Sequence, residues 1–463
     1  PREIRLLKNW DLWGHYHAIE ALLMWHERSG DAAALRAARR AADLVCDTYL
    51  DTGRRVFDAG DHEMNMAILT ALVRLHRLTG ETRYLRMARE VEKDWERAGD
   101  YLRAGLDGRE FFQSPRPRWE SLHDLQGLLE LWRATGDVRY RTAFIHHWRS
   151  IRRWDRRNSG GFSSGEQATG NPYAPTAIET CCTVAWVALT ADYLRLTGDP
   201  HAADELEFST LNGGLGAQHP SGRWWTYNTP MDGAREASAH TIVFQARAGT
   251  PELNCCSVNG PRILGMLSEW AVLQAPDGLA LNWLGPFTAR TRLPEGVSVR
   301  LEVTGDHPRA TPVRITVHPE APAEFTLRVR VPGWTPRARF QLVSAPRPAA
   351  GPLDLPGTPG TYFELRRRWH PGDTLTLTCE MPLRCVPGAR DAEERVSILR
   401  GPLLLAYDQR DNEFDDHEIP PVDLARLGES AVTIPAAEDS ESLTPAPWLR
   451  VTVPTTDASR PLR

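Results

Sequence analysis

The stretch MAILTALVRLHRLTGETRYLRMAREV, residues 66–91, indicates the architecture of the first half of the chain. Apolar residues recur at helical spacing before Gly80 and again after it: Met66, Leu69, Leu72, Val73 and Leu75, then Tyr84, Met87, Ala88 and Val91. Glycine suits the left-handed residue that follows a helix C-terminus. The stretch therefore predicts two helices joined by a tight turn at Gly80.

The same turn signal recurs through residues 11–210. It reads Ser29-Gly30-Asp31, Thr79-Gly80-Glu81, Thr135-Gly136-Asp137 and Thr197-Gly198-Asp199, so its glycines lie 50, 56 and 62 residues apart. Each period holds two helices, and the Asp can cap the second one. Repeated helical hairpins of this kind predict an α/α barrel. A closed six-hairpin barrel needs twelve helices and the chain offers about nine, so we expect further helices ahead of Pro1, which is not a methionine.

The period changes after about residue 275. Polar and apolar residues alternate strictly in Thr374-Leu375-Thr376-Leu377-Thr378 and in parts of 297–303 and 325–331. Pro and Gly lie between these runs. This pattern predicts an antiparallel β-sandwich with irregular Pro-rich segments at 345–360 and 433–463. The expected fold class is therefore α+β and multidomain: an (α/α)6 barrel, N-terminally incomplete, over residues 1–274, followed by a β-sandwich region over 275–463.

Composition limits the kinds of partner. A net charge of −5 with 25% charged residues does not favour binding to nucleic acid, and no apolar stretch is long enough to span a membrane. Oligomeric state is left open. Tryptophan clusters such as Trp224-Trp225-Thr226-Tyr227-Asn228 are typical of sugar-binding sites, with core filling as the ordinary alternative.

Cysteine and carboxylate spacing indicates a metal site. Seven cysteines that include the adjacent pairs Cys181-Cys182 and Cys255-Cys256 fit a disulfide framework poorly. Glu179, Cys181, Cys255 and Cys256 form two short ligand pairs of the kind that zinc binds. A structural zinc, or simply buried cysteines, is the alternative. Glu166 lies in a Gly/Ser-rich loop 13 residues before Glu179, and by itself suits a solvated side chain as well as a catalytic acid.

The order of these pieces resembles glycoside hydrolase family 127, the β-L-arabinofuranosidase family. The resemblance rests on Gly161…Gly165-Glu166, Glu179-Thr180-Cys181 and Cys255-Cys256-x-x-Asn259-x-x-Arg262. It extends to His62-Glu63-Met64-Asn65, Arg330-Val331-Pro332-Gly333-Trp334, Trp369-x-Pro371-Gly372-Asp373 and Leu399-Arg400-Gly401-Pro402-Leu403.

The resemblance implies a role for each matching residue. Glu179, Cys181, Cys255 and Cys256 would hold zinc, Cys255 would be the nucleophile and Glu166 the general acid/base of a retaining glycoside hydrolase. The substrate would be a β-L-arabinofuranoside or a related sugar. His62 and His123 match histidines that line the sugar pocket, and a structural role for each is the alternative.

One loop departs from the family pattern. Where a histidine usually follows a glutamine, the chain reads Gln113-Ser114-Pro115-Arg116-Pro117-Arg118. The change puts the arabinofuranose specificity in question, and Arg116 and Arg118 suit either a carboxylated sugar or a solvated loop.

Two other functions remain compatible with the sequence. One is a non-catalytic carbohydrate-binding or scaffold protein with a structural zinc. The other is an α/α-barrel hydrolase or lyase that uses acids such as Asp61 and Asp124 without metal. Reduced cysteines indicate a cytoplasmic setting.

Overall fold

The computed structural model describes most of the chain. The residues described are 10–162, 165–219, 221–231, 255–345, 353–415, 418–435 and 448–463. They form two compact units, which we describe separately. Unit 1 comprises Pro1–Arg157, Gly161–Pro172 and Cys181–Asp192, and unit 2 comprises Asn158–Gly160, Tyr173–Thr180 and Tyr193–Arg463.

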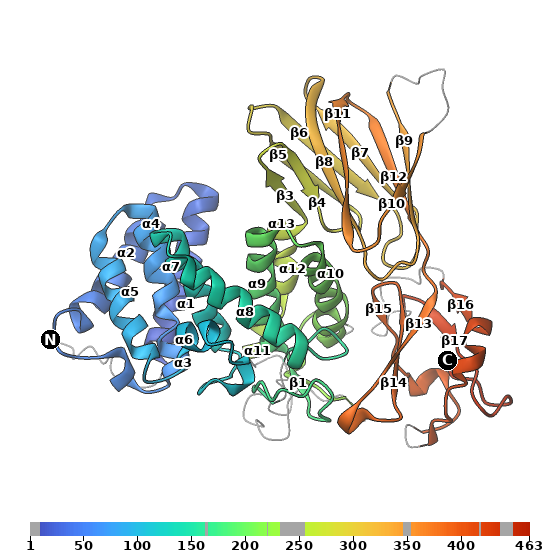
Figure 1. Cartoon of the computed structure of the whole chain (residues 1–463), viewed down its shortest axis with the longest axis horizontal. Helices are drawn as coiled ribbons and strands as arrows, with labels where there is room; N and C mark the ends of the chain where they lie inside the picture. The colour runs from blue at the N-terminus through green and yellow to red at the C-terminus, as the bar shows by residue number, and fades with distance from the viewer. Residues whose placement is uncertain are drawn as a thin grey trace. The chain divides into compact units, whose positions relative to one another are not determined.

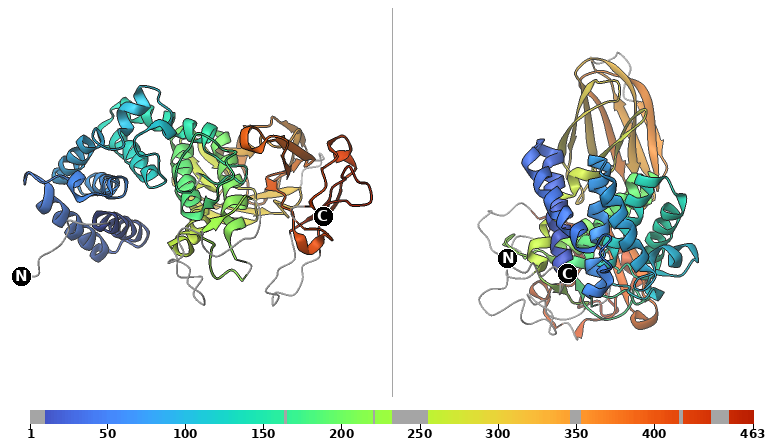
Figure 2. Two further views of the ribbon diagram at one scale, coloured as in Figure 1. Left: turned by 90° about the horizontal axis from the view of Figure 1, so that it is seen from below. Right: turned by 90° about the vertical axis from the view of Figure 1, so that its left-hand side faces the viewer.

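Unit 1 is helical. Its helices are α1 (Asp11–Ser29), α2 (Ala32–Tyr49), α3 (His62–Asn65), α4 (Ile68–Thr79), α5 (Thr82–Trp95), α6 (Tyr101–Leu106), α7 (Ser121–Thr135) and α8 (Val138–Trp154), with part of α9 (Thr180–Thr197). Helices α1 and α2, α4 and α5, and α7 and α8 pack as successive hairpins. Because α4 also contacts α1 and α7 while α2 contacts α5, the hairpins form two layers (Figures 1 and 2).

The four predicted turn glycines end their helices as expected. Gly30, Gly80, Gly136 and Gly198 have φ values of 73°, 75°, 73° and 64°, and each N–H bonds the carbonyl four residues earlier. Asp31, Asp137 and Asp199 cap the next helices by accepting a backbone N–H, whereas Glu81 does not. The prediction of helical hairpins is confirmed.

Burial follows the position of each helix in its layer. Helix α2 buries a single stripe that includes Ala34, Ala38 and Ala42, and its opposite face carries charge. Helix α4 buries every residue from Ile68 to Val73, because it packs against α1, α5 and α7 together. No helix in the described part of the chain is both long and apolar enough to cross a membrane.

Unit 2 contains the sandwich, which Figure 1 shows in yellow and orange. One sheet has six strands in the order β10-β9-β12-β7-β6-β5, and the other has four in the order β11-β8-β4-β3. Their bounds are β3 Val272–Ala275, β4 Gly278–Leu281, β5 Phe287–Arg292, β6 Ser298–Thr304, β7 Val313–Pro319, β8 Ala323–Val331, β9 Ala338–Val343, β10 Leu353–Gly357, β11 Thr361–Trp369 and β12 Asp373–Cys379. Alternate residues such as Leu301, Ile315, Leu327 and Leu375 are fully buried in one core.

Two details of the sandwich differ from the sequence prediction. Strands β4 and β8 pair in parallel, although the other described pairs are antiparallel. The segment 345–360, predicted to be irregular, includes β10, which pairs with β9 from Leu353 to Gly357. Pro356 is tolerated there because β10 is an edge strand, which is where proline occurs in sheets.

Short elements complete unit 2. They are β1 (Ile178–Glu179), α10 (Pro200–Phe208), β2 (Asn228–Thr229), α11 (Cys255–Asn259), α12 (Pro261–Gly265), α13 (Leu267–Trp270), β13 (Leu383–Pro387), β14 (Val396–Arg400), β15 (Leu403–Leu404), β16 (Ala431–Thr433) and β17 (Arg450–Thr452). Strands β16 and β17 pair within the segment 433–463 and just before it, so that segment is also not wholly irregular.

Helix α10 is tied to the sandwich by a buried ion cluster. Glu207 of α10 accepts hydrogen bonds from Arg330 Nη2 at 2.6 Å, His307 Nε2 at 2.9 Å and Trp334 Nε1 at 3.1 Å. Arg330, on β8, also pairs with Asp204. Burial alone would raise the pKa of Glu207, but Arg330 and His307 lower it to about 2. The carboxylate is therefore ionised in its fully buried position.

Candidate metal centre and active site

The four predicted metal ligands converge. Ligand atoms of Glu179, Cys181, Cys255 and Cys256 all lie within 4.8 Å of one another, and Cys256 Sγ is 3.7 Å from Glu179 Oε1. None of these three cysteines forms a disulfide. Cys255 is exposed, whereas the other three residues are buried.

Strand pairing and a helix start position the first ligand pair. Strand β1 pairs with β2, which sets Glu179 opposite Asn228. Thr180, between the two ligands, donates its N–H to the Tyr227 carbonyl at 2.9 Å and its hydroxyl to the Thr226 carbonyl at 2.8 Å. Helix α9 begins here, so Cys181 lies in its first turn, where the helix dipole favours an anionic sulfur.

The second ligand pair, Cys255 and Cys256, begins helix α11. Residues just after the pair contact Trp225, close to the strand that pairs with Glu179. Ser257 Oγ bonds the backbone carbonyl of Trp225 at 3.0 Å. Gly260 lies against the Trp225 ring, where an added Cβ would come within 2.3 Å of ring carbon. Residues 225–229 therefore contact both ligand segments and fix the spacing between them.

The donor set fits zinc. Three sulfurs and one carboxylate oxygen form a four-ligand set of the kind that binds Zn²⁺ tetrahedrally. With bonds of about 2.3 Å, such a tetrahedron has edges of about 3.8 Å, which is close to the 3.7 Å between Cys256 Sγ and Glu179 Oε1.

Glu166 lies on a strained loop in unit 1. Its φ is 71°, a left-handed value that residues other than glycine seldom adopt, and it follows Gly165. Its side chain pairs with Arg118, with Nη2 at 2.6 Å from Oε2. Arg118 belongs to the loop that departs from the family pattern, so that loop contacts the predicted acid/base directly.

His123 lies in an aromatic cluster that the sequence did not predict. Its Nδ1 is 2.8 Å from the hydroxyl of Tyr16, and its ring packs edge-on against Trp13, His17 and Trp119 at 5.1–6.0 Å. Trp13, Tyr16 and His17 lie on one face of α1 at spacings of three and four residues. That spacing was the available signal, since aromatic residues at such positions share a helix face.

His62 begins helix α3 in a more open setting. Its ring stacks on Phe57 with centroids 4.1 Å apart, and Arg116 Nη2 lies 3.5 Å from its Nδ1. His62 is half-buried, while its neighbour Glu63 is buried and lies 3.6 Å from Arg118. Both predicted histidines therefore belong to unit 1, and His62 lies beside the departing loop.

The metal-free alternative loses its support. Asp124 is fully buried, and burial raises its pKa well above the usual range, with Glu63 as a further cause. Asp61 is exposed. A neutral, inaccessible carboxyl and a solvated one do not form the pair that acid–base cleavage of a sugar requires.

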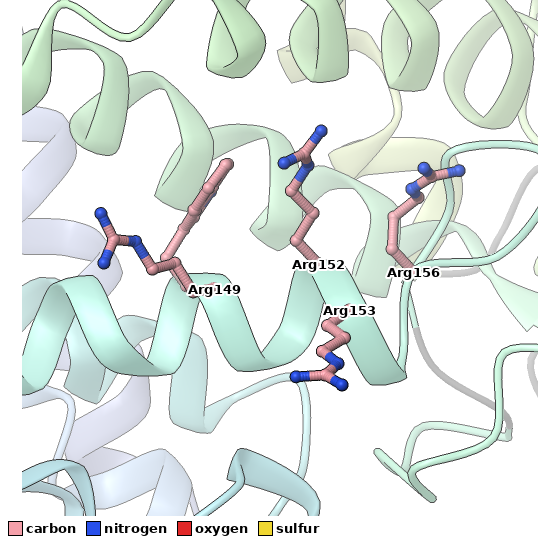
Figure 3. A pocket seen from close by; sticks show the side chains of 5 residues that line it. Arg149, Arg152, Arg153 and Arg156 are labelled. Carbon is pink, nitrogen blue, oxygen red and sulfur yellow. The ribbon is translucent and has the colours of Figure 1, made fainter. Parts of the chain in front are cut away.

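A hollow of about 370 Å³ lies along helix α8, apart from these residues. Trp148, Arg149, Arg152, Arg153 and Arg156 line it, and Figure 3 shows Arg153 on the opposite side of the helix from Arg152. Four guanidinium groups offer neither a nucleophile nor a general base, so we do not assign the active site to it.

Comparison with known proteins agrees with the resemblance in the sequence. Residues 3–269 match the family described as the β-L-arabinofuranosidase GH127 catalytic domain, and residues 279–381 match its middle domain. The chain is 25% identical over 445 residues to a non-reducing end β-L-arabinofuranosidase of Bifidobacterium longum subsp. longum. That alignment covers 87% of this chain and 65% of the relative, so the chain spans slightly less than two thirds of that protein's length.

Solved structures show the same fold. A glycoside hydrolase aligns with a TM-score of 0.74 and 19% identity, covering 97% of this chain and 75% of its own. A GH127 β-L-arabinofuranosidase of Geobacillus stearothermophilus T6 aligns with a TM-score of 0.73 and 22% identity. The alignment covers 98% of this chain and 73% of the Geobacillus protein. The predicted fold class, an α/α barrel followed by a β-sandwich, is confirmed. Because the catalytic-domain match alone covers more than half of the chain, this protein belongs to the GH127 β-L-arabinofuranosidase family.

Proposed function

We propose that the protein is a retaining glycoside hydrolase that cleaves β-L-arabinofuranosides or a closely related sugar. Cys255 is the nucleophile, Glu166 is the general acid/base, and Glu179, Cys181, Cys255 and Cys256 hold a zinc ion. The convergence of these four ligands from two distant segments carries the proposal. Family membership supports it, as does the activity in the names of the relatives.

Exposure distinguishes the nucleophile from the other ligands. Bound zinc would keep the sulfurs as thiolates near neutral pH. Glu179, Cys181 and Cys256 are buried, so their ligand atoms are shielded from a substrate. Cys255 is exposed, and its Sγ is therefore the ligand atom that can reach an anomeric carbon.

The reaction takes two steps. In the first, Cys255 Sγ bonds to the anomeric carbon, the bond to the leaving oxygen breaks, and Glu166 donates a proton to that oxygen. In the second, Glu166 takes a proton from water, whose oxygen attacks the anomeric carbon and releases the thiolate. Two inversions give net retention of configuration.

The histidines of unit 1 suit substrate binding. Half-buried His62 can donate or accept a hydrogen bond, whereas His123 is buried and bonded to Tyr16, so it would support the sugar site from beneath its surface. We assign His62 and His123 to the sugar site.

Residues 1–274 would form the catalytic domain and 275–463 the sandwich region, in line with the bounds of the two family matches. Cysteines that form no disulfide in the described part of the chain favour a cytoplasmic setting.

Activity and metal content test the proposal together. The reductant-treated protein should contain about one zinc per chain and release L-arabinose from an aryl β-L-arabinofuranoside with retention. Cys255→Ser should abolish turnover, because a serine hydroxyl is a far weaker nucleophile and zinc ligand. Cys385→Ser, a partly buried cysteine on β13, serves as the matched control and should stay active. A protein that binds zinc and arabinosides but never hydrolyses them would instead be a sugar-binding protein with a structural zinc.

A further inference from the structure

Arg118 forms ion pairs with three carboxylates of unit 1. Its Nη2 lies 2.6 Å from Glu166 Oε2, and its Nε and Nη2 bond the two oxygens of Glu120 at 3.0 and 3.1 Å. Glu63 Oε1 is 3.6 Å from Nε. The side chains of Arg118 and Glu166 are only 26% and 23% exposed, so solvent screens this pair less than a surface ion pair.

The backbone beside Arg118 also holds the backbone of Glu166. Arg118 and Gln167 form an antiparallel bridge. The Trp119 N–H donates to the Glu166 carbonyl at 3.3 Å, and the Ala168 N–H donates to the Pro117 carbonyl at 2.7 Å. Residues 117–119 therefore support Glu166 through both main chain and side chain, which helps to maintain its left-handed φ.

The chemistry of the guanidinium explains why an arginine suits this position. Its planar fork can bind one carboxylate with two N–H groups and still offer a donor to a second. Glu120 is 1% exposed and directly precedes α7, so it anchors the Arg118 fork to a helix of the barrel. The same fork also bonds Glu166, so it links the loop of the predicted acid/base to α7.

We propose that Arg118 is the positioning residue that holds the Glu166 carboxyl where it exchanges a proton with the glycosidic oxygen. This inference rests on the proposed function, because it takes Glu166 as the acid/base. It also assigns a use to the departing loop Gln113–Arg118: Arg118 supports the catalytic carboxyl rather than binding a charged sugar.

Leaving-group dependence tests the inference. The value of kcat/KM reports steps up to cleavage of the glycosidic bond, and a dinitrophenyl leaving group needs almost no protonation. Arg118→Gln should lower kcat/KM about 10²-fold for an alkyl β-L-arabinofuranoside and far less for the dinitrophenyl one. Arg118→Lys should recover part of the alkyl activity, because an ammonium can still reach Glu166. Arg83→Gln, which removes an arginine that pairs with Asp43 and Asp47 on the α2–α5 face, is the control and should match the wild type on both substrates.

The outcomes separate this inference from the function on which it rests. Equal losses on both substrates in folded Arg118→Gln and Arg118→Lys, or no loss, would overturn the positioning role. If Glu166→Gln shows no leaving-group dependence either, the acid/base assignment and this inference both fail. If Glu166→Gln shows the leaving-group dependence, and adding Arg118→Gln to it lowers kcat/KM no further, the two residues act as one unit, as proposed.

Discussion

At the scale of single residues, Asp155 is a buried carboxyl whose pKa is raised by burial and lowered by hydrogen bonds. Its Oδ1 accepts the N–H groups of Thr169 and Gly170, both at 2.8 Å. Burial raises the pKa of Asp155 to about 6, although these two hydrogen bonds oppose the rise. A carboxyl whose folded-state pKa exceeds its unfolded value stabilises the protein fully below the unfolded pKa, and that stability is lost as pH rises through 6.

Asp155→Asn should therefore change the pH dependence of stability. The amide oxygen can still accept both N–H groups, and the amide does not ionise. We expect the variant to be more stable than the wild type by a small margin at pH 5, where part of the loss has already occurred, and by the full margin at pH 8, on the order of 1–3 kcal/mol. Thermal melts of both proteins between pH 5 and pH 8 measure this. Parallel melting curves across the range would show that Asp155 does not titrate there.

At the scale of elements, the contact between α10 and β8 depends on one buried ion cluster. Glu207 and Arg330 are both fully buried, and Glu207 also takes bonds from His307 and Trp334. Neutralising Glu207 leaves the buried Arg330 with Asp204 as its remaining acidic partner and removes the anionic acceptor of His307 and Trp334, which costs more than the pair itself contributes.

Glu207→Gln should accordingly destabilise the protein by about 3–5 kcal/mol. Arg300→Gln breaks the exposed pair with Glu302 on β6 and should cost less than about 1 kcal/mol, which makes it a matched control. Urea unfolding at neutral pH compares the two. If both variants unfold at the same urea concentration, Asp204 alone compensates Arg330 and Glu207 is not what holds α10 to the sheet.

At the scale of the whole molecule, local chemistry explains what the sequence could predict. The turn glycines and helix caps act within a few residues, so the hairpins could be predicted from residues 66–91 and their repeats. Strict alternation at 374–378 likewise predicted sandwich strands. The edge strand β10 was missed because Pro356 breaks the pattern, and its pairing with β9 depends on the sheet rather than on its own sequence.

The candidate site was predictable only in part for a similar reason. The ligand motifs are short and specific, so Glu179, Cys181, Cys255 and Cys256 could be named, and the structure brings them together. The bond between Tyr16 and His123 joins residues 107 apart, and the pair of Arg118 and Glu166 joins residues 48 apart. No local pattern encodes such contacts, since they form only when hairpins pack.

The central claim is that Cys255 attacks the anomeric carbon, and trapping the glycosylated enzyme tests it most directly. In Glu166→Gln, a dinitrophenyl β-L-arabinofuranoside should still react in the first step, while water lacks its general base in the second. Peptide mapping by mass spectrometry should then find one pentosyl group on Cys255. A pentosyl group mapped to a carboxylate instead of Cys255 would contradict the account.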